Sequence, residues 1–235
     1  MLTMIASIVH DLVHRAFGRD TLADILATDG GAIGSAISSS GAWLMIQFMV
    51  FVYARAQVGQ IQRENPAYDR VTRLLVAAST LSVLRLLAVS SHDLGLLAMQ
   101  SLAIAIVLAV VVIRLRHEVL ARRASTLLAL PFSLLLGWSL LTAIATLTAA
   151  VTAVGGPGTA TAVLLIVITA ALVIYLGLEL RDCVLPGLVG WLLTACAVHA
   201  DVPVTTAALI AAAVCAVTAI VVAGARLAVD PAPRR

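Results

Sequence analysis

The sequence predicts an all-α protein, a polytopic bundle of helices that crosses a lipid bilayer about seven times. Its composition is the first reason. The 235 residues are 62% hydrophobic and only 11% charged, with a mean hydropathy of +1.09, so the chain has too little polar surface to cover a water-exposed globule. Its apolar residues also gather in runs of about 20, the length that a helix needs to span the hydrocarbon core.

Seven apolar windows meet or approach this length, separated by polar or Gly/Pro-rich breaks. The windows cover about residues 36–54, 71–90, 94–113, 125–153, 159–178, 183–199 and 205–226. Two of the links are only a few residues long, so we expect the helices that they join to be antiparallel neighbours. No separate soluble domain is indicated. Residues 32–227 are predicted to form one bundle, followed by a short cytoplasmic tail at 228–235.

Arginine alternates between the links, and all fifteen basic residues are arginine. Arginines follow the first window (Arg55, Arg63, Arg70, Arg73), the third (Arg114, Arg116, Arg122, Arg123), the fifth (Arg181) and the last (Arg226, Arg234, Arg235). The intervening links, SSHD (90–93), GGPG (155–158) and HADVP (199–203), carry none. The positive-inside rule then puts the C-terminus in the cytoplasm of a multi-pass plasma-membrane protein. The absence of lysine excludes Schiff-base chemistry.

Residues 1–31 are consistent with two structures. The stretch MLTMIASIVHDLVHRAF carries its apolar residues broadly on one face and lacks the basic start of a signal peptide. A helix lying in the membrane interface is the physical default for such a pattern. A short eighth crossing is the alternative, and it would put the N-terminus inside.

Catalytic and metal motifs are weak, and we predict that the protein is not an enzyme. HDLVH (10–14) has the histidine spacing of a zinc-protease helix, but Asp11 stands where a glutamate would act and no third ligand follows. The serines of GAIGSAISSSG (31–41) have no obvious intramembrane histidine as a base. An intramembrane hydrolase would rest on these two features alone. The three cysteines have no CxxC spacing.

One apolar window carries an unusual polar and aromatic stripe. In LPFSLLLGWSLLTAIATLTA (130–149), helical spacing puts five residues on one face: Pro131, Leu135, Trp138, Thr142 and Thr146. Such a face suits a cleft wall, where an aromatic plane stacks on a flat ligand and hydroxyls orient it. The alternative is that the stripe packs against neighbouring helices.

Arg85 is an intramembrane charge near the SSHD turn. Charged residues within a span indicate a ligand or pore role by default. An arginine at this depth can also extend to the surface or pair with Asp93. Both interpretations stay open at this point.

Three stretches together resemble the tryptophan-rich sensory protein family, also called translocator-protein or TspO/MBR-like proteins. LPFSLLLGW followed by TAIAT is similar to the last core helix of the longer bacterial form. HDLGLLAMQSLAIAIVLAVVVIRL (92–115) is similar to its acidic turn and apolar helix, and RDCVLPGLVGW (181–191) to its Arg-Asp turn with a tryptophan nine residues on. The resemblance covers roughly residues 40–200. It implies a five-helix core, extended here by C-terminal helices, in a bacterial inner membrane.

The resemblance also implies a ligand pocket among the core helices. The residues that would line it are Trp43, Gln47, Phe51, Arg85, Ser90, Pro131, Leu135, Trp138, Thr142 and Thr146. The chain departs from the family in its aromatics, which make up only 4% of residues: Leu86 and Ser90 stand in aromatic positions, Leu135 replaces a tyrosine, and Thr146 replaces an asparagine.

We therefore expect a non-enzymatic membrane protein that binds or transports a flat hydrophobic ligand such as a porphyrin or other tetrapyrrole. The alternative is a ligand-free accessory subunit of a membrane protein assembly, which the loss of aromatics favours. The partners expected are the lipid bilayer, a membrane-protein partner, or a second copy of the chain packed through the small-residue window 207–225. No nucleic acid is expected.

Overall fold

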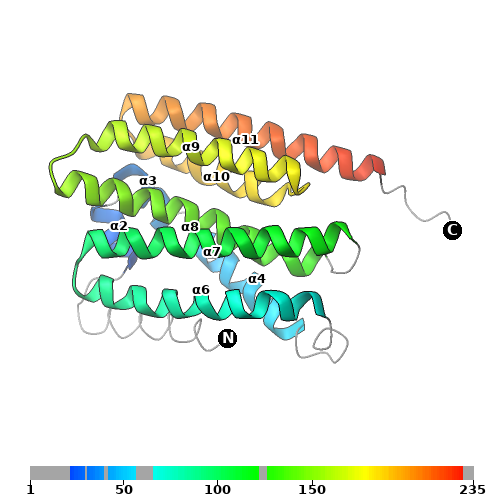
Figure 1. Ribbon diagram of the computed structural model, residues 1–235. Helices are drawn as coiled ribbons and strands as arrows, with labels where there is room; N and C mark the ends of the chain where they lie inside the picture. The colour runs from blue at the N-terminus through cyan, green and yellow to red at the C-terminus, as the bar shows by residue number, and fades with distance from the viewer. Residues whose placement is uncertain (1–21, 30, 40–41, 57–65, 122–125, 230–235) are drawn as a thin grey trace.

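The computed structural model describes residues 22–29, 31–39, 42–56, 66–121 and 126–229, and every regular element in these ranges is an α-helix. The predicted all-α class is confirmed. Five helices are long and apolar enough to cross a bilayer: α6 (Pro66–Ser90), α7 (Leu94–Leu120), α8 (Thr126–Ala153), α9 (Gly158–Glu179) and α11 (Val202–Val229). Consecutive helices from α6 to α11 run antiparallel to one another along the bundle (Figure 1).

The remaining two predicted windows give shorter helices. Window 183–199 forms α10 (Val184–His199), which has 16 residues. Window 36–54 does not form one helix as predicted, because it is divided between α3 (Gly31–Ser39) and α4 (Ala42–Ala56). Ser38 and Ser39, the last two residues of α3, are poor residues for a helix interior, so the end of α3 falls where helix propensity is low.

Helix α8 is the centre of the bundle. In its apolar stretch 72% of the residues are buried, against 44% or less for the other four long helices. It packs against α7, α9 and α10, and also against α3 and α4. Because it is apolar all round, α8 can be buried on every side. Pro131 lies inside α8 without ending it.

Small residues let α10 approach two of its neighbours, α8 and α11, closely. A Cβ added at Gly137 of α8 would lie 3.0 Å from Leu188 Cδ2 of α10. A Cβ added at Gly190 of α10 would lie 3.2 Å from the carbonyl oxygen of Ala212 in α11. Close backbone approach through small residues is how helices gain contact area within a membrane.

The two ends of the bundle differ in charge. Arg55, Arg114, Arg181 and Arg226 all stand at or near the helix ends on one side, next to the α7–α8 and α9–α10 links (Figure 1). The turns after α6, α8 and α10 gather at the opposite end and carry no arginine. We call these the arginine-bearing end and, because its three turns carry no arginine, the arginine-free end; Arg85 lies inside α6, five residues before that helix ends.

The N-terminal predictions fall mostly outside the described residues. Residues 1–21, which include HDLVH, and residues 230–235 of the tail are not described. The short helix α2 (Leu22–Thr28) is described and packs against α3. Its Ile25 is buried with Val89 of α6 and Leu97 of α7.

Candidate functional site

A buried ion pair joins α7 to the turn between α9 and α10. Arg116 Nη2 lies 2.7 Å from Asp182 Oδ1, and Arg116 Nε donates a hydrogen bond of 3.0 Å to Asp182 Oδ2. The two side chains are 1% and 0% exposed. An unpaired charge in such a place would be strongly destabilising, so the two-point pairing is what makes the burial of both groups tolerable.

Ser133 of α8 completes what we call the Arg116–Asp182–Ser133 cluster. Its hydroxyl accepts a hydrogen bond of 3.1 Å from Arg116 Nη2 and donates one to Asp182 Oδ2. Asp182 Oδ1 also accepts a hydrogen bond of 2.9 Å from the backbone N–H of Val184. This carboxylate lies at the N-terminus of α10, where the helix dipole favours a negative charge. Arg116 Nη1 is buried and has no hydrogen-bond partner within the described residues.

The α9–α10 turn holds Asp182 in place by its backbone geometry. The N–H of Asp182 donates to the carbonyl of Gly177 at 2.8 Å, and the N–H of Arg181 donates to that of Leu178 at 3.3 Å. These two bonds, with Arg181 at a φ of +49°, form a Schellman motif. Arg226 of α11 donates from Nη2 to the Arg181 carbonyl. The arginine-bearing end thus ties together α7, α8, α9–α10 and α11.

The arginine-free end has a turn of the same design without the ion pair. After α6, His92 has a φ of +51°, and the N–H of Asp93 donates to the carbonyl of Ala88 at 3.2 Å. Asp93 then caps the next helix, since its Oδ1 accepts a 2.9 Å hydrogen bond from the N–H of Leu96. Asp93 is exposed, whereas Asp182 is completely buried.

The predicted stripe on α8 lies in the core. Trp138 is 7% exposed, Thr142 and Thr146 are buried, and only Leu135 of the five residues is half-buried. The Thr142 hydroxyl donates to the carbonyl of Trp138 and the Thr146 hydroxyl to that of Thr142, both at 2.9 Å. Both hydroxyl protons therefore serve the helix itself. This favours packing for this face, and ligand binding there stays a prediction.

Helix α4 carries three of the predicted pocket residues. The side chains of Trp43 and Gln47 lie outside the described residues. Phe51 is 54% exposed, so its ring faces away from the core. Tyr53 contacts α8 instead, with its ring centroid 4.7 Å from that of Phe132 at an interplanar angle of 83°.

Arg85 and Ser90 lie on α6, in a different layer from the α8 stripe. Arg85 is half-buried, and the exposed Ser90 donates its hydroxyl to the carbonyl of Leu87 at 2.9 Å. The main contacts of α6 are with α7, and α7 in turn packs against α8 (Figure 1). The structure therefore does not gather Arg85 and Ser90 around Trp138.

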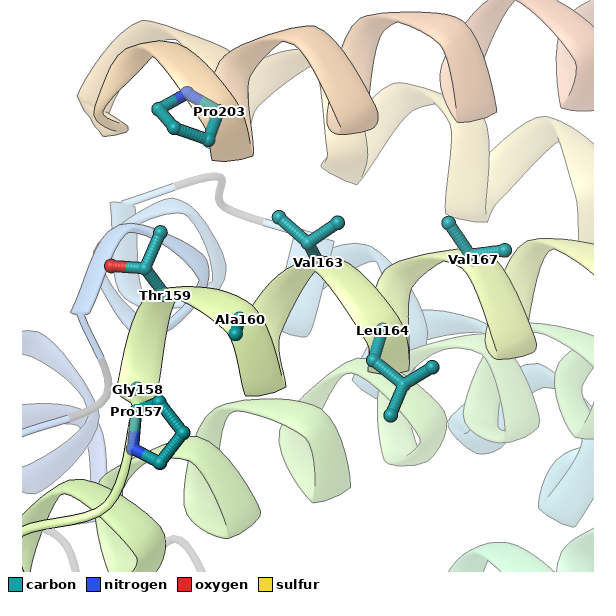
Figure 2. A pocket seen from close by; sticks show the side chains of 8 residues that line it. All are labelled: Pro157, Gly158, Thr159, Ala160, Val163, Leu164, Val167 and Pro203. Carbon is teal, nitrogen blue, oxygen red and sulfur yellow. The ribbon is translucent and has the colours of Figure 1, made fainter.

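An open apolar groove lies between α9 and α11, and we call it the α9–α11 groove. The part near the arginine-free end has a volume of about 740 Å³ and is lined by Pro157, Gly158, Thr159, Ala160, Val163, Leu164, Val167 and Pro203. Figure 2 shows Val163 of α9 pointing toward α11, where Pro203 lies across the gap. An adjoining part of about 650 Å³ continues along both helices over Ala170, Ala171, Ala207 and Ala211.

Sequence reasoning missed the Arg116–Asp182–Ser133 cluster. The sequence predicts that Arg116 belongs to a cytoplasmic link, whereas in the structure it lies inside α7, four residues before that helix ends. Ser133 and Asp182 both stand within stretches that carry the family resemblance, Pro-Phe-Ser and Arg-Asp. The only signal available was an acidic residue, Asp182, in the charged LELRD link at the edge of an apolar window, a pattern more typical of solvated loop charges, and nothing in the spacing indicated that it would pair with Arg116.

The described residues contain no group of three or more His, Cys, Asp or Glu side chains placed to hold a metal ion. Cys196 and Cys215 are buried free thiols, as free cysteines in apolar runs commonly are, and Cys183 is half-buried.

One of the three comparisons with known proteins identifies a family. A family model described as TSPO-like protein matches residues 1–222, which is nearly the whole chain and includes the C-terminal helices. No curated protein and no solved structure matches the chain.

Proposed function

The chain belongs to the TSPO-like protein family, and on that basis we propose that it is a membrane-embedded binding protein for an apolar ligand held in the α9–α11 groove. The ligand would be drawn from the surrounding bilayer. A flat tetrapyrrole such as a porphyrin is the class that the family resemblance suggests. Binding of this kind uses no catalytic group.

The α9–α11 groove is the observation that carries the proposal. Each of its two parts, at about 740 and 650 Å³, has the volume of a small-molecule site. Together they extend along α9 from Pro157 to Ile174, a helix length of about 25 Å at 1.5 Å per residue. By contrast, the face around Trp138 is buried against neighbouring helices, so a ligand there would have to displace packed side chains.

The walls of the groove suit an apolar ligand with few polar groups. Two threonines supply its polar side chains, and that of Thr206 already donates to the carbonyl of Val202 at 2.9 Å. Thr159 stands at the arginine-free end (Figure 2), where it can orient a polar substituent of the ligand. A mainly apolar lining with a few placed polar groups is typical of ligand sites.

We propose further that the protein lies in a bacterial plasma membrane with its arginine-bearing end in the cytoplasm. The uneven distribution of arginine between the two ends supports this orientation. The C-terminus would then be cytoplasmic, and the part of the groove with the larger volume would lie in the opposite leaflet.

The test is porphyrin binding by the full chain in lipid nanodiscs, read from the porphyrin absorbance and from quenching of tryptophan emission. Ala171→Phe puts a large side chain into the groove and should weaken binding about tenfold or more, equivalent to about 1.4 kcal/mol. Ala213→Phe is the matched control. Ala213 is exposed on α11 and does not line the groove, so binding should change less than about twofold.

Two results would contradict the proposal. One is the absence of porphyrin binding at micromolar concentration. The other is equal weakening by Ala171→Phe and Ala213→Phe, because this would mean that the bound porphyrin does not occupy the groove.

One observation favours the alternative of an accessory subunit. The second part of the α9–α11 groove is lined by several alanines, Ala170, Ala171, Ala207 and Ala211, and small residues are also what a packed partner helix requires. A second protein that copurifies stoichiometrically, and is lost with Ala171→Phe but not with Ala213→Phe, would support this function over ligand binding.

A further inference from the structure

We propose that the Arg116–Asp182–Ser133 cluster is a latch that opens and closes the arginine-bearing end of the bundle. In the closed state, seen here, the cluster joins α7, α8 and the α9–α10 turn. In the open state, the ion pair separates, water reaches both charges, and the turn moves away from α7. This inference does not depend on what the α9–α11 groove binds.

The position of the cluster makes it able to act on several helices at once. Arg116 comes from α7, Ser133 from α8 and Asp182 from the α9–α10 turn, and Arg226 of α11 binds the same turn at Arg181. Arg116 lies four residues from the end of α7, about 6 Å along the helix. Water at the membrane surface is therefore close to the pair, and separation of the charges does not expose them to lipid.

The hydrogen bonding of the cluster favours two states over one. Arg116 Nη1 is buried and has no hydrogen-bond partner within the described residues. A buried donor without a partner destabilises the closed state, whereas in the open state water would satisfy it. The free-energy gap between the two states is thereby reduced, which is the condition for a two-state element.

The second turn shows that the cluster is not needed to build such a turn. His92 and Asp93 form the same Schellman geometry at the end of α6, and the exposed carboxylate of Asp93 then caps α7. A turn of this kind can therefore form without a buried ion pair such as that of Asp182. A role beyond turn formation accounts for it.

The experiment uses the native Cys183, which is half-buried and directly follows Asp182 in the chain. The full chain in proteoliposomes is labelled with a small neutral maleimide and, separately, with a bulky polyethylene glycol maleimide. A change in the reactivity of the thiol alters the labelling rates of both reagents equally. Opening of the turn raises the labelling rate of the bulky reagent more than that of the small one. Cys196 and Cys215 are buried between helices, and they report whether the fold is retained.

The wild-type protein should show slow labelling of Cys183 by the bulky reagent. Asp182→Asn should raise the bulky-to-small rate ratio about tenfold, and Ser133→Ala, which changes no charge, should raise it about threefold, because each weakens the closed state. Cys196 and Cys215 should stay unlabelled. Asp93→Asn, the matched change in the turn without an ion pair, should leave the ratio unchanged.

An unchanged ratio in both Asp182→Asn and Ser133→Ala, with Cys196 and Cys215 protected, would overturn the latch and leave a static clamp. Complete resistance of wild-type Cys183 to the bulky reagent would do the same. If all three cysteines are labelled in Asp182→Asn, that variant has unfolded. The test then depends on Ser133→Ala, and an unchanged bulky-to-small rate ratio in that variant overturns the proposal.

Discussion

Arg116 and Asp182 are 66 residues apart in the chain, yet Arg116 contacts both carboxylate oxygens of Asp182 in the interior of the bundle. The contact fixes the end of α7 against the start of α10. In the sequence, neither residue by itself indicates a buried site, since one stands near an arginine-rich link and the other in a charged turn. Two consequences for stability can be measured directly.

Removal of one charge should be far more damaging than removal of its counterpart in the matched turn. Asp182→Asn should lower the free energy of unfolding by about 3–5 kcal/mol, because it leaves Arg116 buried without a counter-charge. Asp93→Asn should change it little, since asparagine caps a helix about as well as aspartate. Unfolding by SDS in mixed micelles measures both variants on the same scale.

A double variant tests whether the charge itself, rather than the space that it fills, causes this loss. Arg116→Met with Asp182→Leu replaces the pair by apolar side chains of similar length, and such replacements are often neutral or stabilising. The double variant should recover most of the stability lost in Asp182→Asn. Equal stability of Asp182→Asn and Asp93→Asn would show that the ion pair contributes nothing.

Two glycines of α10 should respond in opposite ways to the same change. In Gly190→Ala the new methyl group would lie 3.2 Å from a backbone carbonyl oxygen of α11, which cannot move aside like a side chain. In Gly187→Ala its nearest neighbour is Ala219 Cβ at 3.9 Å, an ordinary contact. We expect Gly190→Ala to destabilise by about 1–3 kcal/mol and Gly187→Ala to be neutral or slightly stabilising, because alanine is the better helix former.

The same SDS titration measures this pair, and the loss in Gly190→Ala should reflect separation of α10 from α11. Gly187→Ala is the control, because it adds the same methyl group to the same helix without a close contact. Comparable stability of the two variants would contradict the close approach of these helices.

Much of the fold follows from the sequence because the bilayer constrains it. Apolar runs of about 20 residues gave the five long helices, and the alternation of arginine matches the two ends of the bundle. The division of the first window into α3 and α4 was the exception. There, local helix propensity in a serine run outweighed the overall hydrophobicity on which the prediction depended.

The site was less predictable, because helical periodicity gives a shared face but not what that face contacts. The five stripe residues of α8 do share a face, yet it is packed rather than hollow. On α4, the ring that reaches α8 is Tyr53 and not Phe51, a difference of two positions that rotates the side chain by about 200°. The ion pair depends on contacts 66 residues apart, which no local pattern contains.

The orientation of the bundle can be measured with reporters at its two ends. A reporter enzyme that is active only outside the cytoplasm should be active when fused after Gly155, in the turn between α8 and α9, and inactive when fused at the C-terminus. A reporter that fluoresces only in the cytoplasm should give the reverse pattern. The reason is that the arginine-bearing links resist translocation. Activity at the C-terminus outside the cytoplasm would contradict the orientation.

The two tryptophans of α8 and α10 distinguish a ligand in the α9–α11 groove from one on the α8 stripe. Trp138 is buried in α8, and Trp191 is half exposed on α10, so Trp138→Phe and Trp191→Phe each keep an aromatic ring with little change in packing. A porphyrin in the groove should bind either variant within about threefold of wild type, whereas loss of a direct stacking contact would weaken binding by about 0.5–1.5 kcal/mol or more. Selective weakening in Trp138→Phe, with Ala171→Phe unaffected, would move the site from the groove to the face predicted from the sequence. Weaker binding in Ala171→Phe, with binding by Trp138→Phe unchanged, would place the ligand between α9 and α11, because only the side chain that enters the groove would then compete with it.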